Sequence, residues 1–133
     1  MVTDNQLSLI TVLFVGSHDL LRESLANLMS IQTDMELAGT VITKHEVIEQ
    51  AAHIELDVIL IDLSISEMES LTPIQQIHQA YPHIHIIAMS GFPRKALVDN
   101  MMKAGVERFI KRGDSAQSIV NAIRDVCQIE KEE

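Results

Sequence analysis

Four polar residues that suit phosphoryl chemistry follow short apolar runs of this sequence. Asp62 closes the run DVILID, Ser90 closes IHIIAMS, and Lys111 and Arg112 come directly after ERFI. A carboxylate can accept a phosphoryl group, a hydroxyl can hydrogen-bond to it, and a cation can neutralise its charge. These residue types predict a site that holds a phosphoryl group, provided that the fold brings the ends of the three runs together.

The fold that would position these residues is predicted by five repeats of an apolar strand and an amphipathic helix. We expect strands at 10–15, 36–42, 57–62, 84–90 and 107–110. This alternation is typical of an α/β protein with a doubly wound parallel sheet, a (βα)5 arrangement of three layers. Ligands of such sheets bind beyond the carboxyl ends of the strands, where the strand order reverses. The polar residues are therefore expected to converge there, together with the junction Gly16-Ser17 that follows the first strand.

Local signals between the strands mark the helices. Thr43-x-x-Glu46 and Asp114-x-x-Gln117 match the capping box of a helix N-terminus. Pro73 fits the first turn of the third helix. The spacing of apolar residues predicts these inward-facing side chains: Leu21, Leu25, Leu28, Val47, Ile48, Ala51, Ile74, Ile77, Leu97, Met101, Met102, Ile119, Ile123 and Val126.

Length and composition indicate one cytoplasmic domain. The chain has 133 residues, and we expect an N-terminal extension at 1–9, the domain at 10–128 and a frayed, charged tail at 129–133. The formal net charge is −9 with only 10 Lys and Arg residues, which argues against nucleic-acid binding by this domain. The apolar runs are too short to span a membrane, and no signal peptide is recognisable. The single cysteine, Cys127, suits a reducing compartment and is expected to pack in an apolar helix face.

Four segments of the sequence, in the correct order, resemble the receiver domain of bacterial two-component response regulators. They are SHDLLRESLANLM, DVILIDLSISEMESL, IIAMSG and KAGVERFIKR. The first of them is closest to the subfamily that carries a C-terminal LuxR-type helix-turn-helix. The resemblance implies a flavodoxin-like sheet with strand order 2-1-3-4-5. It also implies a signalling domain and not an enzyme, one that at most accepts and slowly hydrolyses an aspartyl phosphate.

The same resemblance implies roles for single residues and for partners. Asp62 takes the phosphoacceptor position, Ser90 that of the switch hydroxyl and Phe109 that of the switch aromatic residue. Arg112 stands where the family has a lysine, and its planar guanidinium is expected to pair with Asp62. The implied partners are a histidine kinase or another signalling protein, and a C-terminal DNA-binding domain outside this chain that regulates transcription. A second copy is implied as well, bound through the first and fifth helices or through the fourth and fifth.

The end of the first strand departs from the family pattern. Receivers carry two acidic residues there, which hold Mg²⁺ together with the phosphoacceptor and a backbone carbonyl. Gly16 and Ser17 occupy those two places in this chain. Mg²⁺ requires oxygen ligands and usually one or two carboxylates, so Asp62 and the Ser64 carbonyl alone are expected to bind it weakly. Asp19 lies two positions further on, where a helical turn would direct its carboxylate away from the strand ends.

Two functions fit this pattern. Retention of Asp62, Ser90 and Phe109 favours a receiver that is phosphorylated at Asp62. Loss of both acids favours a pseudo-receiver, which would signal through protein contacts without phosphorylation. A flavin- or nucleotide-binding enzyme is a remote alternative, because Gly16 and Ser17 at a helix start could offer amides to a phosphate. The single glycine matches neither the dinucleotide-binding nor the P-loop pattern.

Three histidines have spacings or positions that could bind a metal or assist chemistry. His83 and His85 could lie on one side of a strand, but at the end opposite the predicted site, and no third ligand is evident. His18 adjoins the predicted site, where we expect it to cap the first helix or to pack. The sequence therefore predicts no metal centre formed by these histidines.

Overall fold

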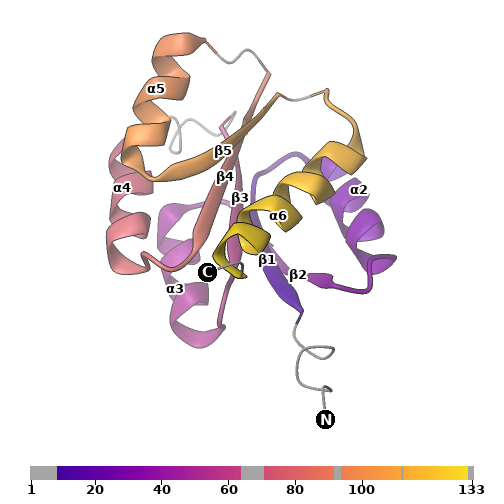
Figure 1. Cartoon of the computed structure of the whole chain (residues 1–133). Coiled ribbons are helices and arrows are strands. Elements are labelled where there is room, and N and C mark those ends of the chain that lie inside the picture. Colours follow the sequence, from indigo (N-terminus) through magenta and orange to yellow (C-terminus); the bar gives the residue numbers. More distant parts are fainter. Residues whose placement is uncertain (1–8, 64–70, 92–93, 112, 132–133) are drawn as a thin grey trace.

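The computed structural model describes residues 9–63, 71–91, 94–111 and 113–131 and has the predicted architecture (Figure 1). Five parallel strands form one sheet in the order β2-β1-β3-β4-β5. The strands are β1 (Ile10–Val15), β2 (Met35–Val41), β3 (Val58–Asp62), β4 (His85–Ser90) and β5 (Val106–Lys111). The helices are α2 (Asp19–Ser30), α3 (Lys44–His53), α4 (Leu71–Ala80), α5 (Lys95–Ala104) and α6 (Ala116–Lys131). Every strand lies within one residue of its predicted range, so the fold class and the strand order are confirmed.

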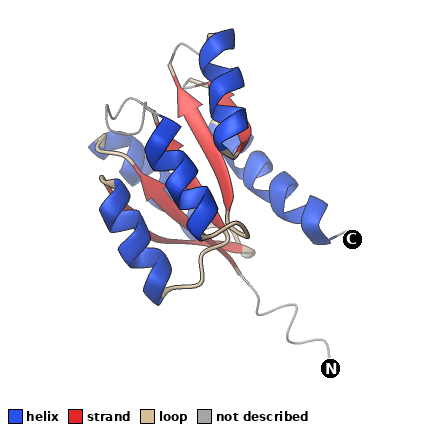
Figure 2. Ribbon diagram, turned by 90° about the vertical axis from the view of Figure 1, so that its left-hand side faces the viewer, coloured by secondary structure: helices blue, strands red, loops and turns tan. Residues whose placement is uncertain are grey.

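Helices cover both faces of the sheet, and each face has its own apolar cluster. α2 and α6 lie on one face, and α3, α4 and α5 lie on the other (Figure 1, Figure 2). The central strand β3 is buried along its whole length. Val58 and Leu60 belong to the cluster under α2 and α6, whereas Ile59 and Ile61 belong to the other cluster. Since successive side chains of a strand point to opposite faces, Asp62 follows Leu60 onto the face of α2 and α6.

The last helix is fixed by ion pairs as well as by apolar packing. Arg124 donates from Nε and Nη2 to the two carboxylate oxygens of Asp34, at 2.7 and 3.0 Å, and from Nη2 to Gln32 at 2.8 Å. Arg108 on β5 pairs with Asp125 on α6 at 3.1 Å. These contacts tie α6 to the connection between α2 and β2 and to the edge strand β5.

No helix in the described ranges is both long and apolar enough to cross a membrane.

A β-bulge on β5 determines which way the side chains of this strand point. The register with β4 shifts by one residue at Glu107, and its carboxylate meets Nδ1 of His85 at 2.8 Å. Val106 and Phe109 therefore both contact the cluster under α3, α4 and α5, although three positions separate them. Ile110 contacts the opposite cluster. The extra residue of the bulge thus places Phe109 on the α3, α4 and α5 side.

The start and the end of α6 differ from the sequence prediction. The capping box predicted at Asp114 is wrong, because Ser118 N donates to Ser115 Oγ at 3.2 Å and the helix starts one residue later than expected. Asp114 is held in the preceding turn, where its backbone N–H donates to the Lys111 carbonyl at 3.0 Å. The helix also continues to Lys131, beyond the point at which a frayed tail was expected.

Most predicted core positions are confirmed, and Met102 is the exception. Its side chain is 44% exposed, whereas Met101 is buried. One face of α5 already reaches the core through Met101 and Ala104, so the neighbouring position turns outward. The residues confirmed as buried are Leu25, Val47, Ile74, Ile77, Met101, Ile119, Ile123 and Val126, and those found half-buried are Leu21, Leu28, Ile48, Ala51 and Leu97.

The capping box predicted at the start of α3 is present. Glu46 N donates to Thr43 Oγ1 at 3.1 Å, and Glu46 Oε1 accepts from the backbone N–H of Ile42 at 2.8 Å and of Thr43 at 3.0 Å. These backbone hydrogen bonds hold the pKa of Glu46 below its usual value of 4.5. The charged carboxylate is therefore the form that caps the helix.

We expect Glu46→Gln to destabilise the protein at neutral pH and to have little effect in acid. A carboxylate with a lowered pKa in the folded state stabilises that state above its unfolded pKa, and this contribution is lost as the pH falls through the folded pKa. Glutamine keeps the acceptor oxygen but lacks the charge. Urea unfolding of both proteins between about pH 7 and about pH 3 measures the difference in free energy of unfolding. A difference that stays constant over this range would contradict the capping role of the charge.

Candidate functional site

The carboxyl edge of the sheet brings together the predicted site residues that the structure describes. Val15, the last residue of β1, pairs with Ile61 on β3. Gly16 and Asp62 are the next residues along the chain. Asp62 pairs with Met89 on β4, directly before Ser90, and Ser90 pairs with Lys111 on β5. The predicted convergence of Gly16, Asp62 and Ser90 at the strand ends is therefore present.

Asp62 lies inside the protein at the end of the central strand. Its exposed fraction is 0%, and it is the one charged residue in the described part of the chain that is buried. The next residue, Leu63, continues the pairing by donating its N–H to the Met89 carbonyl at 2.9 Å. The carboxyl group is thus fixed between strand ends and is not presented to solvent.

The aromatic ring of Phe14 lies over the α-carbon of Gly16. A Cβ atom added to Gly16 would stand 2.7 Å from Phe14 Cε2, in still closer contact with Phe14 Cζ, and 3.2 Å from Asp62 Cβ. Phe14 itself is fully buried in the cluster under α2 and α6. The ring and Asp62 therefore flank the point at which a side chain at position 16 would start.

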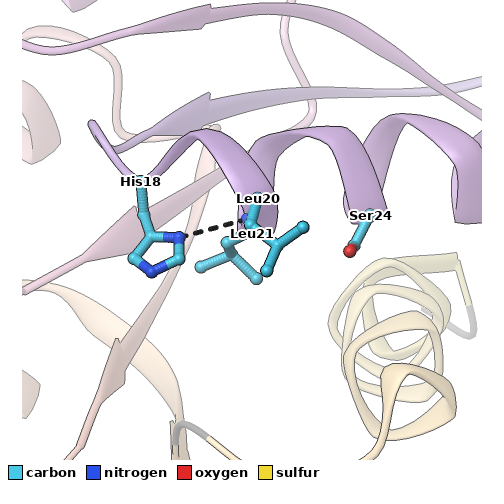
Figure 3. A pocket seen from close by; sticks show the side chains of 4 residues that line it. All are labelled: His18, Leu20, Leu21 and Ser24. Atoms are coloured by element: carbon cyan, nitrogen blue, oxygen red, sulfur yellow. Dashed lines mark hydrogen bonds between the residues drawn. The ribbon is translucent and has the colours of Figure 1, made fainter.

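The residues after Gly16 are engaged with α2 or with solvent. Ser17 is exposed, and His18 is the N-cap of α2, where its Nδ1 accepts from Leu21 N at 3.2 Å (Figure 3). The side chain of Asp19 is 85% exposed and pairs with Arg22 at 3.3 Å. The capping role expected for His18 is confirmed, and the carboxylate of Asp19 is turned to Arg22 and to water.

The described residues at the strand ends do not by themselves fit a Mg²⁺ ion. Asp62 offers a carboxylate, but Gly16 has no side chain and Ser17 is exposed. Among the described residues, no three His, Cys, Asp or Glu side chains are grouped so that they could hold a metal. Mg²⁺ prefers near-octahedral oxygen coordination that includes carboxylates. The described part of this site lacks that donor set.

Of the remaining predicted site residues, the structure describes Ser90, Lys111 and Phe109. Ser90 is half-buried at the end of β4, and Lys111 is exposed, as expected. Phe109 is half-buried and packs against the cluster under α3, α4 and α5. Arg112 and Ser64, which were expected to contact Asp62 and Mg²⁺, lie outside the described residues.

His83 and His85, at the other end of β4, do not form a common site. His83 precedes the strand and is exposed. His85 is 12% exposed, and its Nδ1 contacts both carboxylate oxygens of Glu107, at 2.9 and 2.8 Å. His85 thus contacts Glu107, the extra residue of the β5 bulge.

Two features near the site were not predicted from the sequence. The first is the approach of Phe14 to Gly16, for which the sequence signal is an aromatic residue two positions before the glycine that follows the first strand. The second is a pocket of about 260 Å³ along the first turns of α2, lined by His18, Leu20, Leu21 and Ser24 (Figure 3). Leu20 is 68% exposed, so this pocket has an apolar rim.

Comparison with known sequences places the chain in a family. Residues 12–124 match the model of the response regulator receiver domain. Response regulator protein VraR of Staphylococcus aureus is 31% identical over 115 residues, which are 86% of this chain and 55% of VraR. The chain spans about half the length of the curated relatives that it matches.

Comparison with solved structures agrees with the fold. The signal receiver domain of an HD domain-containing protein from Pseudomonas fluorescens has a TM-score of 0.82 at 21% identity, covering 94% of this chain and 99% of that one. A CheY-like response regulator receiver domain protein from Methanospirillum hungatei has a TM-score of 0.81 at 18% identity, covering 95% and 100%. With the fold and the family match in agreement, the chain belongs to the response regulator receiver domains, which are signalling domains of two-component systems.

Proposed function

We propose that this receiver domain signals through contacts with other proteins and that Mg²⁺-dependent phosphorylation of Asp62 does not set its state. One observation carries the proposal. The Asp62 side chain is completely buried, and the ring of Phe14 occupies the space beside it that a side chain at position 16 would need. The domain is thus a receiver in fold and family, with a fully buried acceptor position.

Electrostatics supports this proposal. Phosphorylation would replace the single negative charge of the Asp62 carboxylate by the roughly two negative charges of an acyl phosphate. Additional buried charge has to be offset by partner groups or a bound cation. The transition state of phosphoryl transfer also depends strongly on electrostatic stabilisation, which a metal ion usually provides. Gly16 and Ser17 supply no carboxylate to hold that ion, which supports the proposal that metal-dependent phosphorylation is not the signal.

A second candidate function is phosphorylation of Asp62, and one observation favours it. Asp62 and Ser90 lie at the ends of the neighbouring strands β3 and β4. A carboxylate acceptor and a hydroxyl that hydrogen-bonds to its phosphoryl group would need this arrangement. In this case a histidine kinase would be the phosphodonor.

The partners that we propose follow from the relatives and from the surface. A histidine kinase or another signalling protein would bind the domain in the cytoplasm, and a DNA-binding domain like those of LuxR-family regulators would carry the output. The apolar rim at Leu20, on a helix that shares its face of the sheet with α6, supports self-association through α2 and α6. Exposure of Met102 supports the alternative pairing through α5 and α6. Sedimentation velocity of the domain determines whether it pairs at all.

The two functions are separated by a titration with beryllofluoride, which mimics a phosphoryl group. We expect amide NMR spectra of the domain to show no saturable shifts at Asp62 and Ser90 in millimolar Mg²⁺. The matched control is Asp62→Asn, whose spectra should respond to the titration in the same way as the wild type. Large shifts at both positions that require Mg²⁺ and are absent in the control would overturn the proposal and establish the second candidate.

A further inference from the structure

We infer that Phe14 determines what the Asp62 site can hold, because its ring takes the space that a metal-binding side chain at position 16 would need. This inference deepens the function proposed above and rests on it. Divalent cations would then be disfavoured for two reasons: positions 16 and 17 carry no carboxylate, and the ring of Phe14 fills the space for one at position 16.

The strand geometry brings the three residues to the same place. Phe14 and Gly16 are two positions apart on one chain, so they share a face of the sheet. Asp62 is level with Gly16 on the neighbouring strand and points to the same face, that of α2 and α6. An atom placed at the Cβ position of Gly16 would be 2.7 Å from the ring at Cε2 and 3.2 Å from Asp62 Cβ. Both distances are shorter than ordinary van der Waals contact.

The ring of Phe14 cannot easily move aside. The exposed fraction of Phe14 is 0%. Leu25 and Met29 of α2, each 1% exposed, belong to the same cluster. Protein interiors are packed as densely as organic crystals, so a shift of an aromatic ring must displace its neighbours. The space over Gly16 is therefore closed by packing and not by a mobile surface side chain.

Backbone conformation gives no separate reason for glycine at position 16. The described glycines with positive φ are Gly105 and Gly113, so the backbone at Gly16 suits any residue. The steric demand at this position comes from the ring of Phe14. Shortening that side chain should thus be sufficient to admit a larger residue at position 16.

The inference is tested by restoring the acidic pair with and without Phe14. The two proteins are Gly16→Asp/Ser17→Asp and Phe14→Val/Gly16→Asp/Ser17→Asp, and Phe14→Val alone is the matched control. We expect Mg²⁺ titration followed by amide NMR to give saturable shifts around Asp62 in the triple variant. Binding by the double variant should be weaker by about tenfold or more, which is the scale on which a misplaced partner weakens a metal site. Phe14→Val alone should not bind, because it adds no carboxylate.

Equal Mg²⁺ affinities of the double and triple variants would overturn the inference. If the double variant does not fold, the unfolding temperatures of Gly16→Ala with and without Phe14→Val decide the matter. We expect the alanine to lower the unfolding temperature by several degrees beside Phe14 and by much less in the Phe14→Val background. Equal losses in the two backgrounds would show that the ring does not control position 16.

This test and that of the proposed function can fail separately. A wild-type domain that responds to beryllofluoride and Mg²⁺ refutes the proposed function, because it would be phosphorylated despite Gly16 and Ser17. The comparison between the two acid-restored variants depends only on whether Phe14 is present. The two failures therefore have different signatures.

Discussion

Gly105→Ala is expected to lower the free energy of unfolding by about 3 kcal/mol. Gly105 ends α5 with a φ of +126°, a conformation that side chains disfavour. An added Cβ would also stand 2.6 Å from Cγ and 2.9 Å from Cβ of His78 on α4. Backbone strain and overpacking thus act together at the point where α4, α5 and β5 meet. The expected fall in unfolding temperature is roughly 10 °C, measured by calorimetry.

Two other glycines separate the two causes. Gly113 has a φ of +105° but open space around its α-carbon, so Gly113→Ala should show the strain alone. Gly91 has neither a positive φ nor a neighbour within 4 Å, and Gly91→Ala should be nearly neutral. The double variant His78→Ala/Gly105→Ala should recover the part of the steric loss that comes from the imidazole ring, because alanine keeps only the Cβ atom of His78. Equal destabilisation at all three glycines would refute this explanation.

Ile123→Ala should cost about 3 kcal/mol, because it opens a cavity between α6 and the sheet. The side chain of Ile123 is 0% exposed in the cluster under α2 and α6, which also contains Val120 and Val126. The unfolding temperature is expected to fall by roughly 10 °C. Urea unfolding measures the free energy directly, and an unchanged m-value would show that the variant still unfolds in one step.

Asn121→Ala is the matched control on the same helix. Asn121 is exposed, so its replacement should change the free energy of unfolding by less than about 0.5 kcal/mol. If both replacements had the same effect, the helix itself and not its packing would be the source of stability. The contrast between them therefore tests whether α6 is held by its buried face.

The fold could be predicted well from the sequence because it follows from two features, the spacing of apolar residues and the alternation of strands and helices along the chain. The three inner strands are apolar runs with a turn or cap on either side, and parallel strands end at one edge. The convergence of Asp62 with Ser90 follows from this rule alone, since both close apolar runs of adjacent strands. Local signals predict the N-cap at Thr43 equally well, because all its hydrogen bonds lie within five residues.

Predictions failed where two local signals competed or where packing decided the outcome. Asp114 and Ser115 can both cap a helix, and only the turn after β5 determines that Ser115 does. Met101 and Met102 are equally apolar, and the rotation of α5 on the sheet decides which one is buried. The reach of the Phe14 ring to Gly16 depends on how α2 packs, which no local pattern encodes.

The contact between Phe14 and Gly16 also limits how the chemistry of this site can change by single mutations. An acidic residue introduced at position 16 alone meets the ring of Phe14. Under our inference, a metal site here would require at least two changes, and shortening Phe14 alone opens a cavity without adding a metal ligand. Single mutations therefore do not lead directly from this packing to a metal-dependent receiver.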